Sequence, residues 1–454
     1  MIRHVIAAAA LLSSVSAVAQ SQQDALDARY DRALAAGYKA LFLCSAIANA
    51  ERAGAERTPE SVTQWELTGI QAPLNGIVGE LPFEIARSGE AMAQVRQVSV
   101  TWAEDMSPRY AVHHAGKGCA LLPIGRQPIQ REDSEFVRAP EHEFAEFMEG
   151  PEESRVDSVV AGAFNDEYGD GTRTTGALVI RRRMIEAAQY APGFSENTPQ
   201  RTWSVAKSIA ATLVGAAVQR GDIEVASSAG LGLTDTDSRR AITVDHLLRM
   251  ASGRYSDTPG NRTDPLYFGG ATVGERAAVW PLIHAPGTVF RYANNDTLMA
   301  VKAIENTFEQ HPPAEFFARL GMHDTVAETD WQGDYILSSQ VWSTARDLAV
   351  LGQLYLDGGV WNGERLLPEG WAAYVSSPSG PQPEGDFGYG AGFWLFNASD
   401  GVPADTYAAM GNRGQFVVVV PSRDVVIVRR GEDPAGSRFD IAGFTRDVLA
   451  ALDN

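Results

Sequence analysis

A serine and a lysine stand three residues apart at the head of an apolar segment. Ser204 and Lys207 belong to the stretch SVAKSIAATLVGAAVQRG, which ends at Gly221, a residue typical of helix ends. On a helix, the two side chains share one face, so Lys207 can reach the Ser204 hydroxyl. Desolvation favours the neutral form of a lysine, which can then activate a serine as nucleophile. The helix start adds a partial positive potential suited to a developing oxyanion.

A second pair of polar residues follows the turn sequence APGT at positions 285–288. Tyr292 and Asn294 are two residues apart and can point the same way from an extended or turning segment. A tyrosine can act as general base when a cation stabilises its phenolate, and an asparagine can orient a lysine or a substrate amide. Taken alone, the pair is more typical of a packed tyrosine beside a turn asparagine.

A third element, GNRGQ at positions 411–415, directly precedes an apolar strand. Its glycines would let a substrate lie close to the strand edge, where backbone N–H groups can donate. Taken alone, it is an ordinary turn into a strand. Arg413, next to Asn412, can bind a substrate carboxylate through two hydrogen bonds if its side chain enters the cleft. If the side chain turns outward instead, neutral esters should be handled equally well.

In this order, the three elements resemble the penicillin-recognising serine hydrolase superfamily. That superfamily includes class C β-lactamases, DD-peptidases, related esterases and 6-aminohexanoate-dimer hydrolases. The resemblance covers residues 156–452 and extends to three further segments, 246–253, 286–292 and 343–348. The esterase and 6-aminohexanoate-dimer hydrolase branch is the closest match.

The resemblance implies a role for each residue. Ser204 would be the nucleophile, Lys207 its activating partner and Tyr292 the general base, and which of the latter two takes the proton first stays open. Backbone N–H groups of Ser204 and Gln415 would form the oxyanion hole. The remaining positioning and tentative substrate-binding residues would be Asn294, Gly414, Asn412 and Arg413.

One departure from the superfamily affects the expected substrate. Lactamases and DD-peptidases usually carry Lys or His, then Thr or Ser, then Gly, where this chain has Asn412, Arg413 and Gly414. We therefore expect a serine hydrolase acting on a small ester or amide. The alternatives are a peptidoglycan-directed DD-peptidase or β-lactamase, and a non-catalytic module that binds peptidoglycan or peptide. A Ser-His-Asp triad using Asp245 and His246 is the rival mechanism, but the chain has no Gly-x-Ser-x-Gly.

The elements around these residues predict an α+β fold. Apolar strands are expected at 177–180 and 184–190 as antiparallel neighbours, and a hairpin at 415–421 and 424–429. A helix should close the chain at 439–452. Strands at both ends with helices between them indicate an antiparallel sheet flanked by helices. The resemblance adds an inserted helical subdomain of the β-lactamase and transpeptidase kind within residues 151–454.

Residues 20–150 form a separate, smaller α/β region of unknown role. Regular apolar spacing predicts a helix from 24 to 53, which Gly54 ends. Strands are expected at 97–102 and 119–124. The acidic stretch PEHEFAEFMEGPEES, at 140–154, is typical of a solvated linker or helix face.

The first 19 residues are typical of a secretory signal peptide. They combine an early positive charge, Arg3, with an apolar run and an Ala-Val-Ala cleavage pattern that ends at Ala19. We therefore expect a periplasmic or secreted protein with no membrane attachment after cleavage. In an oxidising compartment we expect Cys44 and Cys119 to form a disulfide, and the alternative is two separately buried thiols.

Composition limits the possible partners. The net charge of −19 disfavours nucleic acid and anionic membranes, because both are polyanions. No Cys-x-x-Cys or His-Glu-x-x-His motif occurs, so neither a metal nor another cofactor is expected. The expected partner is a small-molecule ester, amide or peptide substrate.

Overall fold

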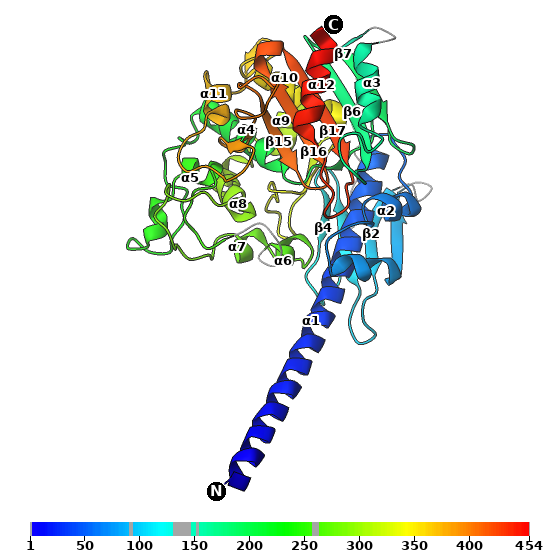
Figure 1. Cartoon of the computed structure of the whole chain (residues 1–454), viewed down its shortest axis with the longest axis vertical. Coiled ribbons are helices and arrows are strands. Elements are labelled where there is room, and N and C mark those ends of the chain that lie inside the picture. The colour runs from blue at the N-terminus through cyan, green and yellow to red at the C-terminus, as the bar shows by residue number, and fades with distance from the viewer. Residues whose placement is uncertain (1, 90–93, 130–146, 151–153, 257–262, 454) are drawn as a thin grey trace.

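The computed structural model describes residues 2–89, 94–129, 147–150, 154–256 and 263–453, with only the backbone for residues 2–19. Its centre is an eight-stranded sheet in the order β13-β14-β15-β16-β17-β6-β7-β5 (Figure 1). Neighbouring strands are antiparallel, except that β5 runs parallel to β7. The bounds of these strands are β5 (Met148–Glu149), β6 (Thr174–Arg181), β7 (Met184–Tyr190), β13 (Gly388–Tyr389), β14 (Trp394–Leu395), β15 (Tyr407–Gly411), β16 (Gln415–Val420) and β17 (Val425–Gly431).

Alternating side chains of the central strands supply two cores, one on each face of the sheet. On β17, Val426 and Val428 belong to the larger core, whereas Val425 and Ile427 belong to the smaller one. The larger core includes α4 (Val205–Arg220) and α10 (Ala345–Leu356). The smaller core is covered by α3 (Arg155–Gly162) and α12 (Ile441–Asp453). The α+β prediction, the two strand pairs and the closing helix are confirmed.

The segment between α4 and α10 forms the inserted helical part. It contributes several short helices and two strands, β9 and β10, of a small three-stranded sheet in the order β8-β10-β9, whose third strand, β8, directly precedes α4. The bounds of these elements are α5 (Val244–Leu248), α6 (Asp264–Tyr267), α7 (Val273–Arg276), α8 (Asn294–Lys302), α9 (Pro313–Leu320), β8 (Gln200–Arg201), β9 (Val326–Ala327) and β10 (Val341–Ser343). After α10 come β11 (Val360–Trp361), β12 (Glu364–Arg365) and α11 (Trp371–Ser376).

The N-terminal unit, from α1 to β4, is a helix packed on an antiparallel four-stranded sheet. Its elements are α1 (Ile2–Arg52), α2 (Pro59–Trp65), β1 (Phe83–Ser88), β2 (Gln94–Val100), β3 (Arg109–His114) and β4 (Gly118–Leu121). A disulfide joins Cys44 of α1 to Cys119 of β4, as predicted. The helix begins well before the predicted residue 24, and its first half projects away from the body of the protein (Figure 1).

Burial divides α1 into two parts. Residues 20–30 are exposed, whereas the helix is buried from Ala33 to Ala50. Within the described residues, Gln20–Arg52 is the one helical segment long and apolar enough to cross a membrane, but its apolar window is fully buried inside the protein. The buried half of α1 shares one continuous core with α4 and α10, so the N-terminal unit is packed into the rest of the molecule.

Two predicted strands have other bounds than expected, and the acidic stretch is described only in part. Strand β2 begins before the predicted residue 97 and ends before Trp102, and β4 is shorter than predicted because it ends before Ile124. Of residues 140–154, Met148–Glu149 form β5, and most of the others lie outside the described residues.

Candidate active site

Ser204 stands at the start of the buried helix α4. It is the N-cap residue, yet its side chain makes no capping hydrogen bond, so the hydroxyl is available for other partners. The preceding residue, Trp203, has a φ of 49°, which turns the chain sharply from β8 into the helix. The first 13 residues of α4 are buried, because the helix is apolar on nearly all sides.

Lys207 lies one helical turn from Ser204 and is 1% exposed. Its ammonium nitrogen donates to Ser204 Oγ at 2.9 Å, to Asn294 Oδ1 at 2.6 Å and to the carbonyl oxygen of Ser338 at 2.9 Å. Burial lowers the pKa of Lys207 from 10.5 to about 7. Near neutral pH the amine therefore exists in both charged and neutral forms beside the serine oxygen.

Tyr292 approaches the same oxygen from the segment before α8. Its phenol is hydrogen-bonded to Ser204 and to Trp394, and burial raises its pKa to about 12. The Lys207 nitrogen lies 5.0 Å from the centre of the Tyr292 ring, close enough for a cation–π contact. Trp394 and Tyr389 also pack against the Tyr292 ring, with centroid distances of 5.3 and 6.0 Å, respectively.

The turn between β15 and β16 borders the serine. A Cβ added to Gly411 would overlap the carbonyl oxygen of Thr202 and lie 3.0 Å from the backbone nitrogen of Ser204. The end of β15 therefore reaches the backbone of Ser204 only because residue 411 has no side chain. Gln415 pairs with Gly411 across the hairpin. Its buried side chain donates to the Gly431 carbonyl oxygen and accepts from Arg430 Nε, so the amide group is used inside the protein.

The two tentative substrate-binding residues lie in different surroundings. Asn412 is exposed at the tip of the turn. Arg413 is 6% exposed, and its Nε donates to Glu432 Oε2 at 2.5 Å. One terminal nitrogen of Arg413 donates to carbonyl oxygens of the N-terminal unit. The sequence allowed two orientations of this side chain, into the cleft or into solvent. The structure shows neither, because the side chain is buried against Glu432 and the N-terminal unit. We therefore do not propose Arg413 as a substrate ligand.

The surroundings of Gly414, and those of Asp245 and His246 from the rival triad, indicate structural roles. Gly414 has a φ of 76°, and an added Cβ would collide with the Arg429 guanidinium, so glycine is required there. His246 Nδ1 accepts from the backbone N–H of Thr243 as part of a helix cap, while Asp245 accepts from Arg249 and Tyr374. In the part of the chain that is described, these two residues make no contact with Ser204.

Sequence reasoning missed three groups at the site: Ser338, Tyr389 and Trp394. The Ser338 carbonyl oxygen accepts from Lys207, and its hydroxyl forms a 2.6 Å hydrogen bond with Tyr267. Every residue type carries the same backbone carbonyl, so no sequence signal could have identified this hydrogen-bond acceptor. The two aromatic residues lie in two-residue strands, β13 and β14, which are too short to show a period in the sequence.

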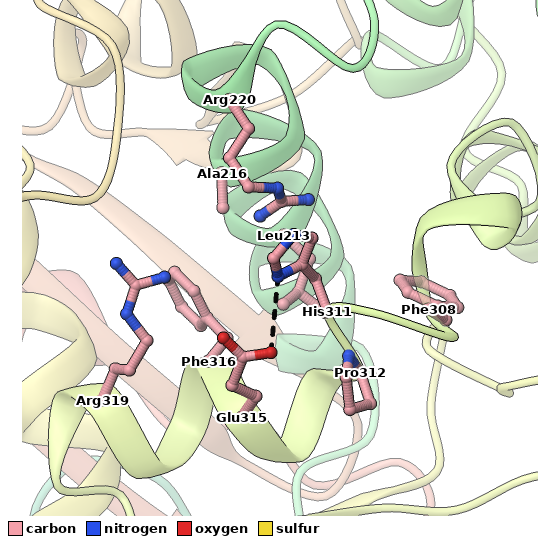
Figure 2. A pocket seen from close by; sticks show the side chains of 9 residues that line it. All are labelled: Leu213, Ala216, Arg220, Phe308, His311, Pro312, Glu315, Phe316 and Arg319. Carbon is pink, nitrogen blue, oxygen red and sulfur yellow. Dashed lines mark ion pairs between the residues drawn. The ribbon is translucent and has the colours of Figure 1, made fainter.

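Two cavities lie close to these elements. The first, of about 120 Å³, is lined by residues 253–255, 283–284 and 289–291, directly before Tyr292. The second, of about 10 Å³, lies farther along α4 beside Leu213, Ala216 and Arg220, where His311 and Glu315 form an ion pair (Figure 2). Leu213 is nine residues from Ser204, roughly 13 Å along the helix, so this second cavity is separate from the site. Among the described residues, no group of three or more His, Cys, Asp and Glu side chains could hold a metal ion.

Comparisons with known proteins identify a family for the chain. The Beta-lactamase family model matches residues 155–449. The chain is 23% identical over 398 residues to 6-aminohexanoate-dimer hydrolase from Paenarthrobacter ureafaciens, which covers 78% of this chain and 93% of that protein.

Solved structures show the same fold. One from Bacillus anthracis, assigned as a 6-aminohexanoate-dimer hydrolase, superposes with a TM-score of 0.52 at 19% identity, covering 62% of this chain and 79% of the other. Another from Bacteroides dorei, assigned as a β-lactamase, gives 0.53 at 17% identity, covering 64% and 96%. The chain belongs to the Beta-lactamase family and is a serine hydrolase of that fold.

Proposed function

We propose that this protein is an exported serine hydrolase that cleaves a small ester or amide through an acyl-enzyme on Ser204. The observation that carries the proposal is the Lys207 amine, buried and 2.9 Å from the Ser204 oxygen. A serine hydroxyl is a weak nucleophile unless a neighbouring base removes its proton. An amine with a pKa of about 7 can do so at neutral pH, whereas an ordinary lysine cannot.

The protonation states near neutral pH favour Lys207 over Tyr292 as the first acceptor of the Ser204 proton. With a pKa of about 12, the Tyr292 phenol holds its proton near neutral pH and acts as a donor. Neutral Lys207 would accept the Ser204 proton while the serine oxygen bonds to the substrate carbonyl carbon. Tyr292 would pass its proton to the leaving group as the carbon–heteroatom bond breaks, and would regain one from the Lys207 ammonium. Water would then release the acyl group by the reverse proton transfers.

The developing oxyanion requires donors beside Ser204. The helix start supplies the Ser204 backbone N–H, and the turn at residues 411–415 is the second element that borders it. Gln415, the donor implied by the resemblance, belongs to this turn. Asn294 would keep the Lys207 amine directed at the serine through its 2.6 Å contact.

Three observations bear on the substrate and on export. Arg413 is the one cationic residue among residues 411–415, and it is bound by Glu432 instead of facing the site. The lack of a free cation there favours a small ester or amide substrate over the carboxylate of a β-lactam. The relative from Paenarthrobacter ureafaciens is named for an amide substrate, which agrees with this class. Export is supported by the exposed residues 20–30, because removal of residues 1–19 would leave the buried half of α1 in place.

A fluorophosphonate probe tests the proposal directly. Intact-mass analysis of the wild-type protein should show one adduct, absent in Ser204→Ala, together with hydrolysis of p-nitrophenyl esters. Ser208→Ala, on the same helix, is the matched control and should keep the adduct. A folded Ser204→Ala protein that still hydrolyses the esters would overturn the mechanism. Side-by-side assays with D-amino-acid amides and a chromogenic cephalosporin decide between this activity and a peptidase or β-lactamase.

A further inference from the structure

The N-terminal unit contacts the active-site turn through Arg413. One terminal nitrogen of this guanidinium donates to the carbonyl oxygens of Trp65 at 2.8 Å and Thr68 at 2.9 Å. The Nε of Arg413 binds Glu432 at 2.5 Å, and both members of this ion pair are buried. A second buried pair, Arg57 with Glu66, lies in the same stretch of the N-terminal unit. The turn is therefore held between the end of β17 and the N-terminal unit.

The same turn reaches the nucleophile. Arg413 has a φ of 56°, a left-handed conformation that a non-glycine residue adopts only when its surroundings hold it there. Two residues earlier, Gly411 lies against the backbone nitrogen of Ser204. The fixed side chain of Arg413 thus sets the position of the backbone that faces the Ser204 N–H.

A second contact of the N-terminal unit holds residues 201–203, the segment that directly precedes Ser204. Phe42 of α1 packs against Trp203, with ring centroids 5.8 Å apart. The guanidinium of Arg201 lies 5.0 Å from the Phe42 ring and 4.2 Å from the Trp203 ring. Arg201 also donates to Ser339 Oγ at 2.9 Å, next to the Ser338 carbonyl that binds Lys207. Residues 201–203, including the left-handed Trp203, therefore rest on an aromatic side chain of the N-terminal unit.

We propose that the N-terminal unit is a positioning element of the active site, with Arg413 and Phe42 as its positioning residues. Arg413 fixes the turn at the oxyanion side of Ser204, and Phe42 fixes the strand that delivers Ser204. The inference rests on the proposed function, because it assigns the unit to the acylation step at Ser204. It gives a role to residues 20–121, which carry none of the residues proposed to act in catalysis.

The chemistry makes such positioning matter. Oxyanion donors act in the transition state and must lie within hydrogen-bond distance of a single point, so a shift of about 1 Å can cost on the order of 100-fold in rate. Lysine in place of Arg413 would keep the charge beside Glu432. Its single ammonium does not reproduce the planar fork that serves Glu432 and two backbone carbonyls together.

Two variants and two matched controls test the inference. Arg413→Lys loosens the turn, and Phe42→Leu removes the aromatic face beneath Arg201 and Trp203. Arg173→Lys is the control for the first, since Arg173 donates to the Gln64 carbonyl of α2, next to the Trp65 carbonyl that Arg413 binds, but its side chain makes no hydrogen bond to residues 411–415. Phe83→Leu is the control for the second, because Phe83 belongs to β1 on the sheet of the N-terminal unit. Each protein is titrated with a fluorophosphonate, and kcat is calculated per titrated Ser204.

Titration separates positioning from loss of folded protein. We expect kcat per site to fall about 10- to 100-fold in Arg413→Lys and Phe42→Leu, with KM changed by less than about threefold. Both controls should keep kcat within about twofold of wild type, even where Tm falls. Wild-type kcat in folded Arg413→Lys and Phe42→Leu would overturn the positioning role. If one of them does not fold, the other decides. Failure of wild-type protein to label at Ser204 would instead overturn the proposed function.

Discussion

The Lys207 ammonium nitrogen lies 2.9 Å from the Ser204 hydroxyl oxygen, one helical turn away on the same face of α4. Among the described residues, no carboxylate contributes to the pKa of this lysine, whose shift to about 7 comes from burial. The amine is instead held by neutral oxygens of Asn294 and Ser338. These partners orient the group and leave its neutral form accessible, which an ion pair would not.

Lys207 and Tyr292 should behave as one proton-transfer unit. Lys207→Ala and Tyr292→Phe should each lower kcat by about 100- to 10,000-fold, because each breaks the transfer between Ser204 and the leaving group. The double variant should lose less than about tenfold more than the worse single variant. Steady-state kinetics on an amide substrate, whose amine leaving group must be protonated, measure all three. Losses that simply multiply would show that the two residues act independently.

The rate of acylation should rise with pH through about 7. Lys207 is active when neutral, so protonation below its pKa of about 7 removes the base, and activity falls on the acid side. Tyr292 adds no decline below about pH 10, because its pKa is about 12. The second-order rate of fluorophosphonate labelling from pH 5 to 9 measures this without substrate-specific steps. A rate that stays constant down to pH 5 would contradict the assignment of Lys207 as the base.

Gly411→Ala should impair the site. The new methyl group would overlap the Thr202 carbonyl oxygen and lie 3.0 Å from the Ser204 nitrogen, so the turn or the serine must move. We expect kcat to fall at least about tenfold, with a smaller change in KM. Gly274→Ala is the control, because an added Cβ there has only one neighbour, at 4.0 Å. Equal kcat in the two variants would show that β15 does not constrain the serine.

Loss of the disulfide should destabilise the N-terminal unit. Cys44 and Cys119 are 75 residues apart, and opening a loop of that length should lower the free energy of unfolding by about 4 kcal/mol. Urea unfolding of Cys44→Ser/Cys119→Ser, compared with wild type, measures the loss. Peptide mapping without reductant establishes the bond in the wild-type protein. Recovery of both cysteines as free thiols from protein made in an oxidising compartment would refute it.

The local pattern of the sequence determined much of the fold. An apolar run from Ser204 to Gly221 can only be a buried helix, and helical geometry then places Lys207 beside Ser204 whatever the rest of the chain does. β-Branched runs near the C-terminus likewise determined the β16–β17 hairpin, and a shared apolar face determined the buried half of α1. These features depend on residues within one or two elements.

Tertiary structure alone decided which distant groups complete the site. The Ser338 carbonyl reaches Lys207 across 131 residues, and the Trp65 carbonyl reaches Arg413 across 348. Backbone carbonyls are the same in every residue, so their use leaves no trace in residue type or spacing. The direction of Arg413 depends equally on burial beside Glu432, because an arginine on a strand edge is otherwise free to face cleft or solvent. Long-range packing of the N-terminal unit fixed that direction, and no local pattern encodes it.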